Sequence, residues 1–210
     1  MTGRAGGAPR ATAQAEAQRE RILDAAQKCF IERGFHAASI ASIAQTAGMS
    51  AGLMYRYFEN KNAIVTAIIE RELGHSRAKI ADLYTRADLL HRIVETVRQW
   101  QVGDPGAMNA ALYLETSAEA TRDPEIAEVV ASSDARVRGE FECWLGRGRD
   151  AGGLGLPPDV ARSRALLMQC LVSGLAVRAV REPDLDLRVL QAALDPLLRY
   201  LGLTPARTGP

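Results

Sequence analysis

Residues 38–61 read ASIASIAQTAGMSAGLMYRYFENK, and this stretch decides the fold. Ser39 precedes apolar residues at helical spacing that end at Gly48, as in a two-turn helix with a serine cap and a glycine stop. A second short helix is expected over residues 51–58, after a turn that ends at Ser50. Two short helices joined by a glycine-containing turn are typical of a helix-turn-helix.

Longer helices are expected on either side of this motif. Residues 16–33 place apolar side chains at helical spacing, and Gly34 supplies a stop. Another helix is expected over residues 62–79. Neither serine cap is followed three residues later by Glu or Gln, so no complete capping box is expected. The small core that holds the two short helices is predicted to contain Ile40, Ile43, Ala44, Met49, Met54 and Phe58.

The composition predicts an all-α fold. Aromatic residues make up 5% of the 210 residues, and the common residues are good helix formers. The expected organisation is a disordered tail over 1–15, a three-helix DNA-binding domain over 16–61, a connecting helix over 62–79 and a larger helical domain over 80–204. Helices in the larger domain are expected at about 82–102, 107–121, 124–150, 159–181 and 184–202, separated by proline and glycine.

The charge is unevenly distributed. The chain has 26 basic and 25 acidic side chains, but residues 1–78 hold ten basic against seven acidic ones. A modestly basic first third suits a polyanion-binding module, although solvated helix faces often show the same bias. The N-terminus lacks an apolar run, and residues 165–177 are too short to span a bilayer. A cytoplasmic protein without a membrane segment is therefore expected.

Motifs for catalysis and cofactor binding are absent from the sequence. No GxSxG, HExxH or P-loop pattern occurs, and the three histidines lack metal-ligand spacing. No catalytic residue, metal or cofactor is expected, and the chain is predicted not to be an enzyme. The alternative is an all-helical enzyme or carrier with an incidental helix-turn-helix. Cys29, Cys143 and Cys170 are expected to be buried structural thiols, with oxidant sensing as the alternative.

Over about residues 16–65 the sequence resembles the DNA-binding domain of the TetR family of transcriptional regulators. The resemblance depends on Ser39, Ile43-Ala44, the turn Ala47-Gly48-Met49-Ser50, Gly52, Tyr55, Tyr57-Phe58 and Lys61. It implies a repressor that binds double-stranded operator DNA as a homodimer. It also implies release from DNA when a small apolar or amphipathic effector binds the C-terminal domain. An activator of the same fold remains an alternative.

In a helix-turn-helix the second helix enters the major groove. By the resemblance, Tyr55, Tyr57 and Lys61 contact the phosphate backbone. Arg56 is the candidate for base readout, because its planar guanidinium fits guanine O6 and N7. Alternatively, the tyrosines are half-buried aromatics and Arg56 is a solvated surface charge. The predicted DNA-binding residues are Ser39, Ser50, Ala51, Gly52, Leu53, Tyr55, Arg56, Tyr57 and Lys61.

The resemblance also implies that the last two helices pair with those of a second copy. Both carry broad apolar faces, although a core within one chain would show the same pattern. Pro196 is expected to kink the second helix or end it early. The predicted interface residues are Leu171, Leu175, Ala179, Leu190, Leu194, Leu197 and Leu198.

The effector site is expected on the segments that line the pocket in relatives. Glu115 and Glu119, one turn apart, would suit a lipophilic cation or form a solvated helix face. Plain core packing is the alternative for each apolar member. The predicted ligand-binding residues are Trp100, Met108, Tyr113, Glu115, Phe141, Trp144 and Met168.

Overall fold

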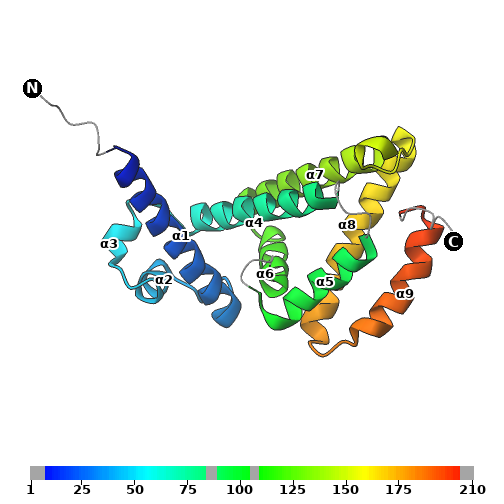
Figure 1. The fold of residues 1–210 in the computed structure, drawn as a ribbon. Coiled ribbons are helices and arrows are strands. Elements are labelled where there is room, and N and C mark those ends of the chain that lie inside the picture. Colours follow the sequence, from blue (N-terminus) through cyan, green and yellow to red (C-terminus); the bar gives the residue numbers. More distant parts are fainter. Residues whose placement is uncertain (1–7, 84–88, 105–108, 204–210) are drawn as a thin grey trace, which may run out of the picture.

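The computed structural model describes residues 8–83, 89–104 and 109–203. Within these ranges the chain forms helices and no strands, which confirms the all-α fold class. Figure 1 shows an elongated molecule with α1–α3 at one end and α8 and α9 at the other. The helices are α1 (Ala8–Arg33), α2 (Ile40–Thr46), α3 (Ala51–Met54), α4 (Lys61–Leu83), α5 (Leu89–Val102), α6 (Ala110–Ala120), α7 (Pro124–Gly146), a 3-10 turn (Arg149–Ala151), α8 (Pro158–Arg181) and α9 (Leu187–Tyr200).

Helix α1 begins earlier than the sequence suggested. The expected tail is wrong for residues 8–15, which are helical, and residues 1–7 lie outside the described ranges. Ala, Gln, Glu and Arg dominate the segment before residue 21, and these good helix formers extend an existing helix without needing burial. The predicted connecting helix is also longer, because α4 continues to Leu83.

Serine side chains begin helices α2 and α3. Ser39 Oγ accepts from the Ser42 backbone N–H at 3.1 Å, and Ser42 Oγ accepts from the Ser39 N–H at 2.9 Å. This is a complete capping box, so the expectation that none forms is wrong: a serine hydroxyl replaces the usual Glu or Gln. Ser50 Oγ accepts from the Leu53 N–H at 3.2 Å and caps α3.

The N-terminal helices share one apolar core. Of the six predicted core residues, Ile43, Ala44, Met54 and Phe58 are buried, while Ile40 and Met49 pack against them, which confirms the prediction. The same core includes Leu112 of α6 and Ile126 of α7. The helix-turn-helix unit is therefore packed directly against the larger unit.

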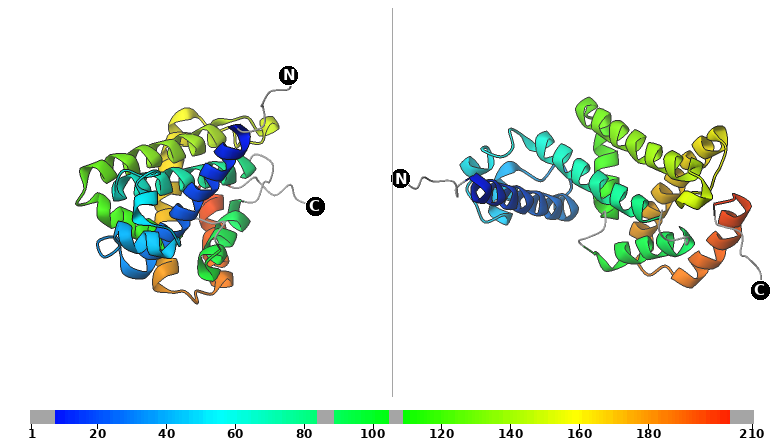
Figure 2. Two further views of the ribbon diagram at one scale, coloured as in Figure 1. Left: turned by 90° about the vertical axis from the view of Figure 1, so that its left-hand side faces the viewer. Right: turned by 45° about the horizontal axis from the view of Figure 1, so that its top comes forward.

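The larger unit is built around α7 and α8. Helices α4 and α7 run side by side, α7 also packs on α6 and α8, and α5 packs on α8 and α9 (Figures 1 and 2). By length and composition α8 could cross a membrane, but a core helix of a globular protein passes the same test. Here α8 packs against α5, α6 and α7.

Pro196 does not end α9 early, although the sequence offered an early end as one of two alternatives. The helix continues to Tyr200, and Pro196 itself is exposed. Leu194 and Leu198, on either side of the proline, are both buried in the core that α9 shares with α5. Burial of these leucines offsets the lost backbone hydrogen bond.

Candidate functional site

The turn between α2 and α3 depends on Gly48. Its φ of +64° lies in the left-handed region that favours glycine. A Cβ at this position would lie 2.7 Å from Arg21 Nη2, so the Arg21 side chain covers the turn. Helix α3 has only four residues, shorter than the expected 51–58. Residues 55–57 follow in tight turns, in which the Tyr57 N–H donates to the Met54 carbonyl at 2.9 Å.

The outer surface of α3 and of the turn that follows it carries four of the nine predicted DNA-binding residues. Ala51, Gly52, Tyr55 and Arg56 are exposed, and Tyr55 is 58% exposed despite its large ring. Among the described residues, apart from the chain neighbours and the backbone of its own helix, no atom lies within 4 Å of a Cβ built at Gly52. Packing within the chain therefore does not require glycine there, whereas close approach by another molecule would.

The other predicted residues of the motif have structural contacts of their own. Leu53 and Tyr57 are half-buried, and Tyr57 packs against the N-terminal core. Ser39 and Ser50 are exposed but their hydroxyls accept hydrogen bonds as helix caps. Tyr57 therefore fits the alternative of a half-buried aromatic residue.

Lys61 points into the chain. Its Nζ donates to the Phe35 carbonyl at 2.9 Å and to the Ala38 carbonyl at 3.3 Å, and lies 4.2 Å from the centroid of the Phe35 ring. Burial lowers the pKa of Lys61 below its ordinary value, and the negative charge of Glu119 partly opposes this shift. The ammonium thus secures the segment between α1 and α2 and does not project from the surface of α3.

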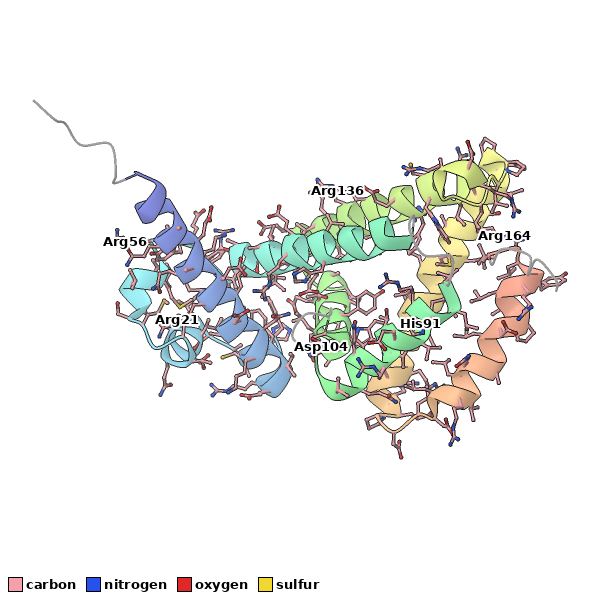
Figure 3. The ribbon with its side chains drawn as sticks, in the orientation of Figure 1. Arg21, Arg56, His91, Asp104, Arg136 and Arg164 are labelled. Atoms are coloured by element: carbon pink, nitrogen blue, oxygen red, sulfur yellow. The ribbon has the colours of Figure 1, made fainter. Side chains whose placement is uncertain are left out.

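Two arginines that the sequence did not single out join this end of the molecule. Arg19 lies over the Phe58 ring at 4.4 Å, and Arg21 lies over the Gly48 turn. Figure 3 places Arg21 and Arg56 at the end formed by α1–α3. Helical spacing alone put Arg19 and Arg21 on a polar face of α1. Only the packing of α1 against the helix-turn-helix places these two charges on the same surface as α3.

A cavity of about 220 Å³ lies between α4, α5, α6, α7 and α8. Three of the predicted ligand-binding residues, Trp100, Tyr113 and Phe141, line it. Met168 lines a neighbouring cavity of about 120 Å³, which Trp100 and Phe141 also border. Aromatic side chains from three helices therefore converge on one space, as in small-molecule sites.

The other predicted ligand residues lie elsewhere. Trp144 is buried in the core of the larger unit, and Met108 lies outside the described residues. Glu115 does not line the cavity, because its Oε2 accepts from the Phe35 backbone N–H at 3.1 Å. Neither Glu115 nor Trp144 therefore lines this cavity. Residues two apart on an α-helix do not share a face, so α6 turns Glu115 away from the side that carries Tyr113.

The cavity also contains polar groups that the sequence did not indicate. Tyr113 Oη and Ser173 Oγ are 2.7 Å apart and share a hydrogen bond. Glu72 and His75 from α4 and Asp134 from α7 complete the charged or titratable lining. Partial burial raises the pKa of the Asp134 carboxyl, and the positive charge of Arg138 opposes this shift. Because α4 was expected only as a connecting helix, its contribution to the cavity was missed.

Helix α6 joins the cavity to the helix-turn-helix unit. Its Tyr113 and Thr116 line the cavity, whereas Glu115 binds the Phe35 N–H. The buried Glu119 Oε2 lies 3.3 Å from His36 Nε2, in the same segment after α1. Neither glutamate lies on a solvated helix face, and neither supplies a negative charge to the cavity. Both hold the two units together.

A second joint connects α4 to the start of α7. Asn62 Nδ2 donates to Asp123 at 2.9 Å and to Glu125 at 3.0 Å. The Asn62 bond and the backbone amides of Ile126 and Glu125 lower the pKa of Asp123, which also caps α7. Rotation of α4 relative to α7 would break these contacts.

Helices α8 and α9 expose apolar side chains away from the core. The predicted interface residues Leu175, Ala179, Leu194 and Leu198 are buried within the chain, which fits the alternative of a core within one chain. Leu197 is 42% exposed, and Leu171 and Leu190 are half-buried. The apolar stripe of each helix is broad enough to cover two faces, and periodicity could not separate them. The large exposed apolar residues on these helices are Leu166, Leu167, Val180, Val189, Leu197 and Tyr200.

Residue types that bind metals, and the three cysteines, lie within the described ranges. There, no three His, Cys, Asp or Glu side chains come together to hold a metal ion. Cys29 is buried, with Sγ 3.3 Å from Thr46 Oγ1, whereas Cys143 and Cys170 are exposed. The expectation of buried thiols is therefore right for Cys29 and wrong for the other two.

Comparison with known proteins agrees with this arrangement. Residues 22–68 match the family described as bacterial regulatory proteins, tetR family, and residues 86–201 match the C-terminal domain described as BetI-type transcriptional repressor. The HTH-type transcriptional regulator UidR of Escherichia coli K12 is 33% identical over 172 residues, covering 78% of this chain and 83% of UidR. The HTH-type transcriptional repressor Rv1474c of Mycobacterium tuberculosis is 26% identical, covering 80% of this chain and 85% of its own.

Solved structures show the same fold. GusR of Salmonella enterica superposes with a TM-score of 0.64 at 26% identity, covering 87% of this chain and 96% of GusR. A transcriptional regulator from Saccharomonospora viridis, described in complex with choline, gives a TM-score of 0.68 at 21% identity over 88% of this chain and 97% of its own. These relatives are transcriptional regulators and not enzymes. The family matches over both halves of the chain agree with its 33% identity to UidR. The chain therefore belongs to the TetR family of bacterial transcriptional regulators.

Proposed function

We propose that this chain is a cytoplasmic, ligand-responsive transcriptional repressor that binds a palindromic operator as a homodimer. The exposed residues of α3 and of the turn after it, Ala51, Gly52, Tyr55 and Arg56, enter the major groove, and Arg56 reads a base edge. Ala51 and Gly52 offer no hydrogen-bonding side chain, so the remaining specificity comes from thymine methyl contacts and DNA shape. Arg19 and Arg21 add positive charge for the flanking phosphates.

The exposed apolar face of α8 and α9 supports the homodimer. Val189, Leu197 and Tyr200 recur along one side of α9, where they are exposed among the described residues. Pairing of this face with its copy would place two α3 helices in a two-fold arrangement. Such a dimer binds half-sites related by the helical repeat of DNA.

Helix α6 carries the ligand response. The contacts on the two sides of α6 are the single observation on which this function depends. One side of α6 lines the cavity with Tyr113 and Thr116, and the other side holds the DNA-binding unit through Glu115 and Glu119. A small effector that binds better to a conformer with displaced α6 would lower DNA affinity by the same coupling energy. The choline complex described for the Saccharomonospora regulator supports a small-molecule site in this fold.

A mobility-shift assay with the DNA flanking the protein's own gene tests this function. We expect a sequence-specific shift at moderate salt and loss of that shift when a small amphipathic compound binds. Transcription from the same promoter should rise when the gene is deleted, whereas a fall would indicate an activator. Absence of any sequence-specific shift would contradict the proposed function.

A further inference from the structure

Two hydroxyl groups from different helices meet in the wall of the larger cavity. Tyr113 of α6 and Ser173 of α8 both line this cavity and are half-buried. Tyr113 Oη lies 2.7 Å from Ser173 Oγ, and either atom can donate that hydrogen bond. Two hydroxyls carry two protons, and their mutual bond uses one. The second proton has no acceptor among the residues that the structure describes, so the pair offers a hydrogen-bond donor to a ligand.

Three other hydroxyls of the cavity wall are already used within their own helices. Thr96, Thr116 and Ser117 each donate to the carbonyl four residues earlier, at 2.9, 3.0 and 2.7 Å. A hydroxyl has a single proton, so these three side chains have none left for a ligand. The Tyr113–Ser173 pair differs from them in keeping one proton to donate.

The acidic groups of the wall already have partners in the chain. Glu72 Oε1 accepts from Gln27 Nε2 at 3.2 Å, and its Oε2 lies 3.8 Å from His75 Nδ1. The positive charge of Arg138 acts on the Asp134 carboxyl and opposes the rise in its pKa on burial. The described lining contains no Lys or Arg that could pair with a ligand carboxylate. An anion would lack a counter-charge and a cation would have to displace existing partners, so the wall favours an uncharged ligand.

The rest of the wall suits a small apolar body. It includes the rings of Trp100 and Phe141 and the side chain of Val172. The volume of about 220 Å³ lies below the roughly 300–1,000 Å³ of most drug-sized ligand sites. The cavity therefore combines apolar surface for a small molecule with one hydroxyl donor at the contact between α6 and α8.

We propose that the effector is a small uncharged compound with an apolar body and a hydrogen-bond-accepting oxygen, such as a ketone or an ester, and that this oxygen accepts from the Tyr113–Ser173 pair. This inference rests on the proposed function and names its effector class. The apolar body packs against Trp100 and Phe141. Because Tyr113 lies on α6 and Ser173 on α8, the ligand oxygen joins a hydrogen bond that already connects these two helices.

Calorimetric titration of the full chain, without DNA, tests the charge of the ligand. The probes are 4-phenyl-2-butanone, 3-phenylpropanoate and 4-phenylbutan-2-ammonium, which have nearly the same shape and differ in charge. We expect the ketone to bind about tenfold more tightly than either ion. Equal or tighter binding of one of the ions, or no binding of the ketone at millimolar concentration, would overturn the proposal.

A variant without the two hydroxyls tests the position of the ligand oxygen. Butylbenzene has the carbon skeleton of the ketone but no oxygen, so it reports packing alone. The double variant Tyr113→Phe/Ser173→Ala should weaken ketone binding about fivefold and leave butylbenzene binding unchanged. Either single variant should lose less, because the remaining hydroxyl can still donate to the ligand.

The matched control removes the same two groups at exposed positions. Tyr200→Phe/Ser132→Ala should alter the binding of neither compound, since Tyr200 is 87% exposed and Ser132 is exposed on α7. Unchanged ketone binding in the cavity variant, or an equal loss for ketone and butylbenzene, would overturn the role of the hydroxyl pair. Circular dichroism confirms that each variant is folded. Because every titration omits DNA, these outcomes are distinct from failure of operator binding.

Discussion

Replacement of Lys61 by alanine separates a structural lysine from a DNA contact. In the structure its ammonium donates to two backbone carbonyls, at 2.9 and 3.3 Å, and lies 4.2 Å from the centroid of the Phe35 ring. A hydrogen bond from a charged donor contributes about 1.5–3 kcal/mol net, and a cation-π contact adds roughly 0.5–1 kcal/mol. Partial burial disfavours the charge, so we expect Lys61→Ala to lower the free energy of unfolding by about 2–3 kcal/mol.

Urea unfolding followed by circular dichroism measures this loss, and a salt titration of operator binding measures the phosphate contact. Lys28→Ala is the matched control, because Lys28 is 63% exposed and makes only a 3.9 Å pair with Glu32. This control should stay within about 0.5 kcal/mol of the unaltered chain. Below its unfolding transition, the Lys61 variant should keep the same salt dependence of DNA binding.

The opposite pattern would refute the structural role of Lys61. A true phosphate contact would leave stability within about 0.5 kcal/mol and reduce the slope of log affinity against log salt by about one. That result would mean that the ammonium leaves the Phe35 carbonyl when DNA binds.

Four further substitutions test the motif and the exposed apolar face. Arg56→Ala should relax preference at one base pair in a binding-site selection, and an unchanged selected site would exclude base readout. Gly48→Ala should cost about 1–2 kcal/mol in urea unfolding because of its positive φ; Gly52→Ala, in open space, should keep stability but weaken DNA binding. Leu197→Glu should yield a monomer in analytical ultracentrifugation, whereas Arg188→Glu on the same helix should not; a persisting dimer would place the interface elsewhere.

Local signals were sufficient for the helix-turn-helix. Serine caps, the Gly48 stop and apolar residues at helical spacing act within a few residues, so Ser39, Ser50, Ile43 and Met54 were assigned correctly. The tail was misjudged because residues 8–15 offer no large apolar side chains to bury but continue a helix already formed. Rules that consider only neighbouring residues predict where a helix is stable more readily than where its end frays.

Contacts between distant segments could not be predicted in the same way. Lys61 meets the Phe35 carbonyl across 26 residues, and Glu115 meets the Phe35 N–H across 80. Glu72 was missed because a connecting helix gave no reason to place one of its carboxylates in a cavity. A broad leucine stripe likewise leaves open which side faces the core, as the buried Leu198 and exposed Leu197 show.

Selection of binding sites from random double-stranded DNA is the most direct test of the central claim that α3 reads an operator as part of a two-fold dimer. With the full purified chain at moderate salt, we predict enrichment of a palindrome whose half-sites are separated by about one helical turn, 10–10.5 base pairs. Addition of a bound effector should reduce recovery of that sequence. Failure to enrich any sequence, or enrichment of a single non-repeated site, would contradict the claim.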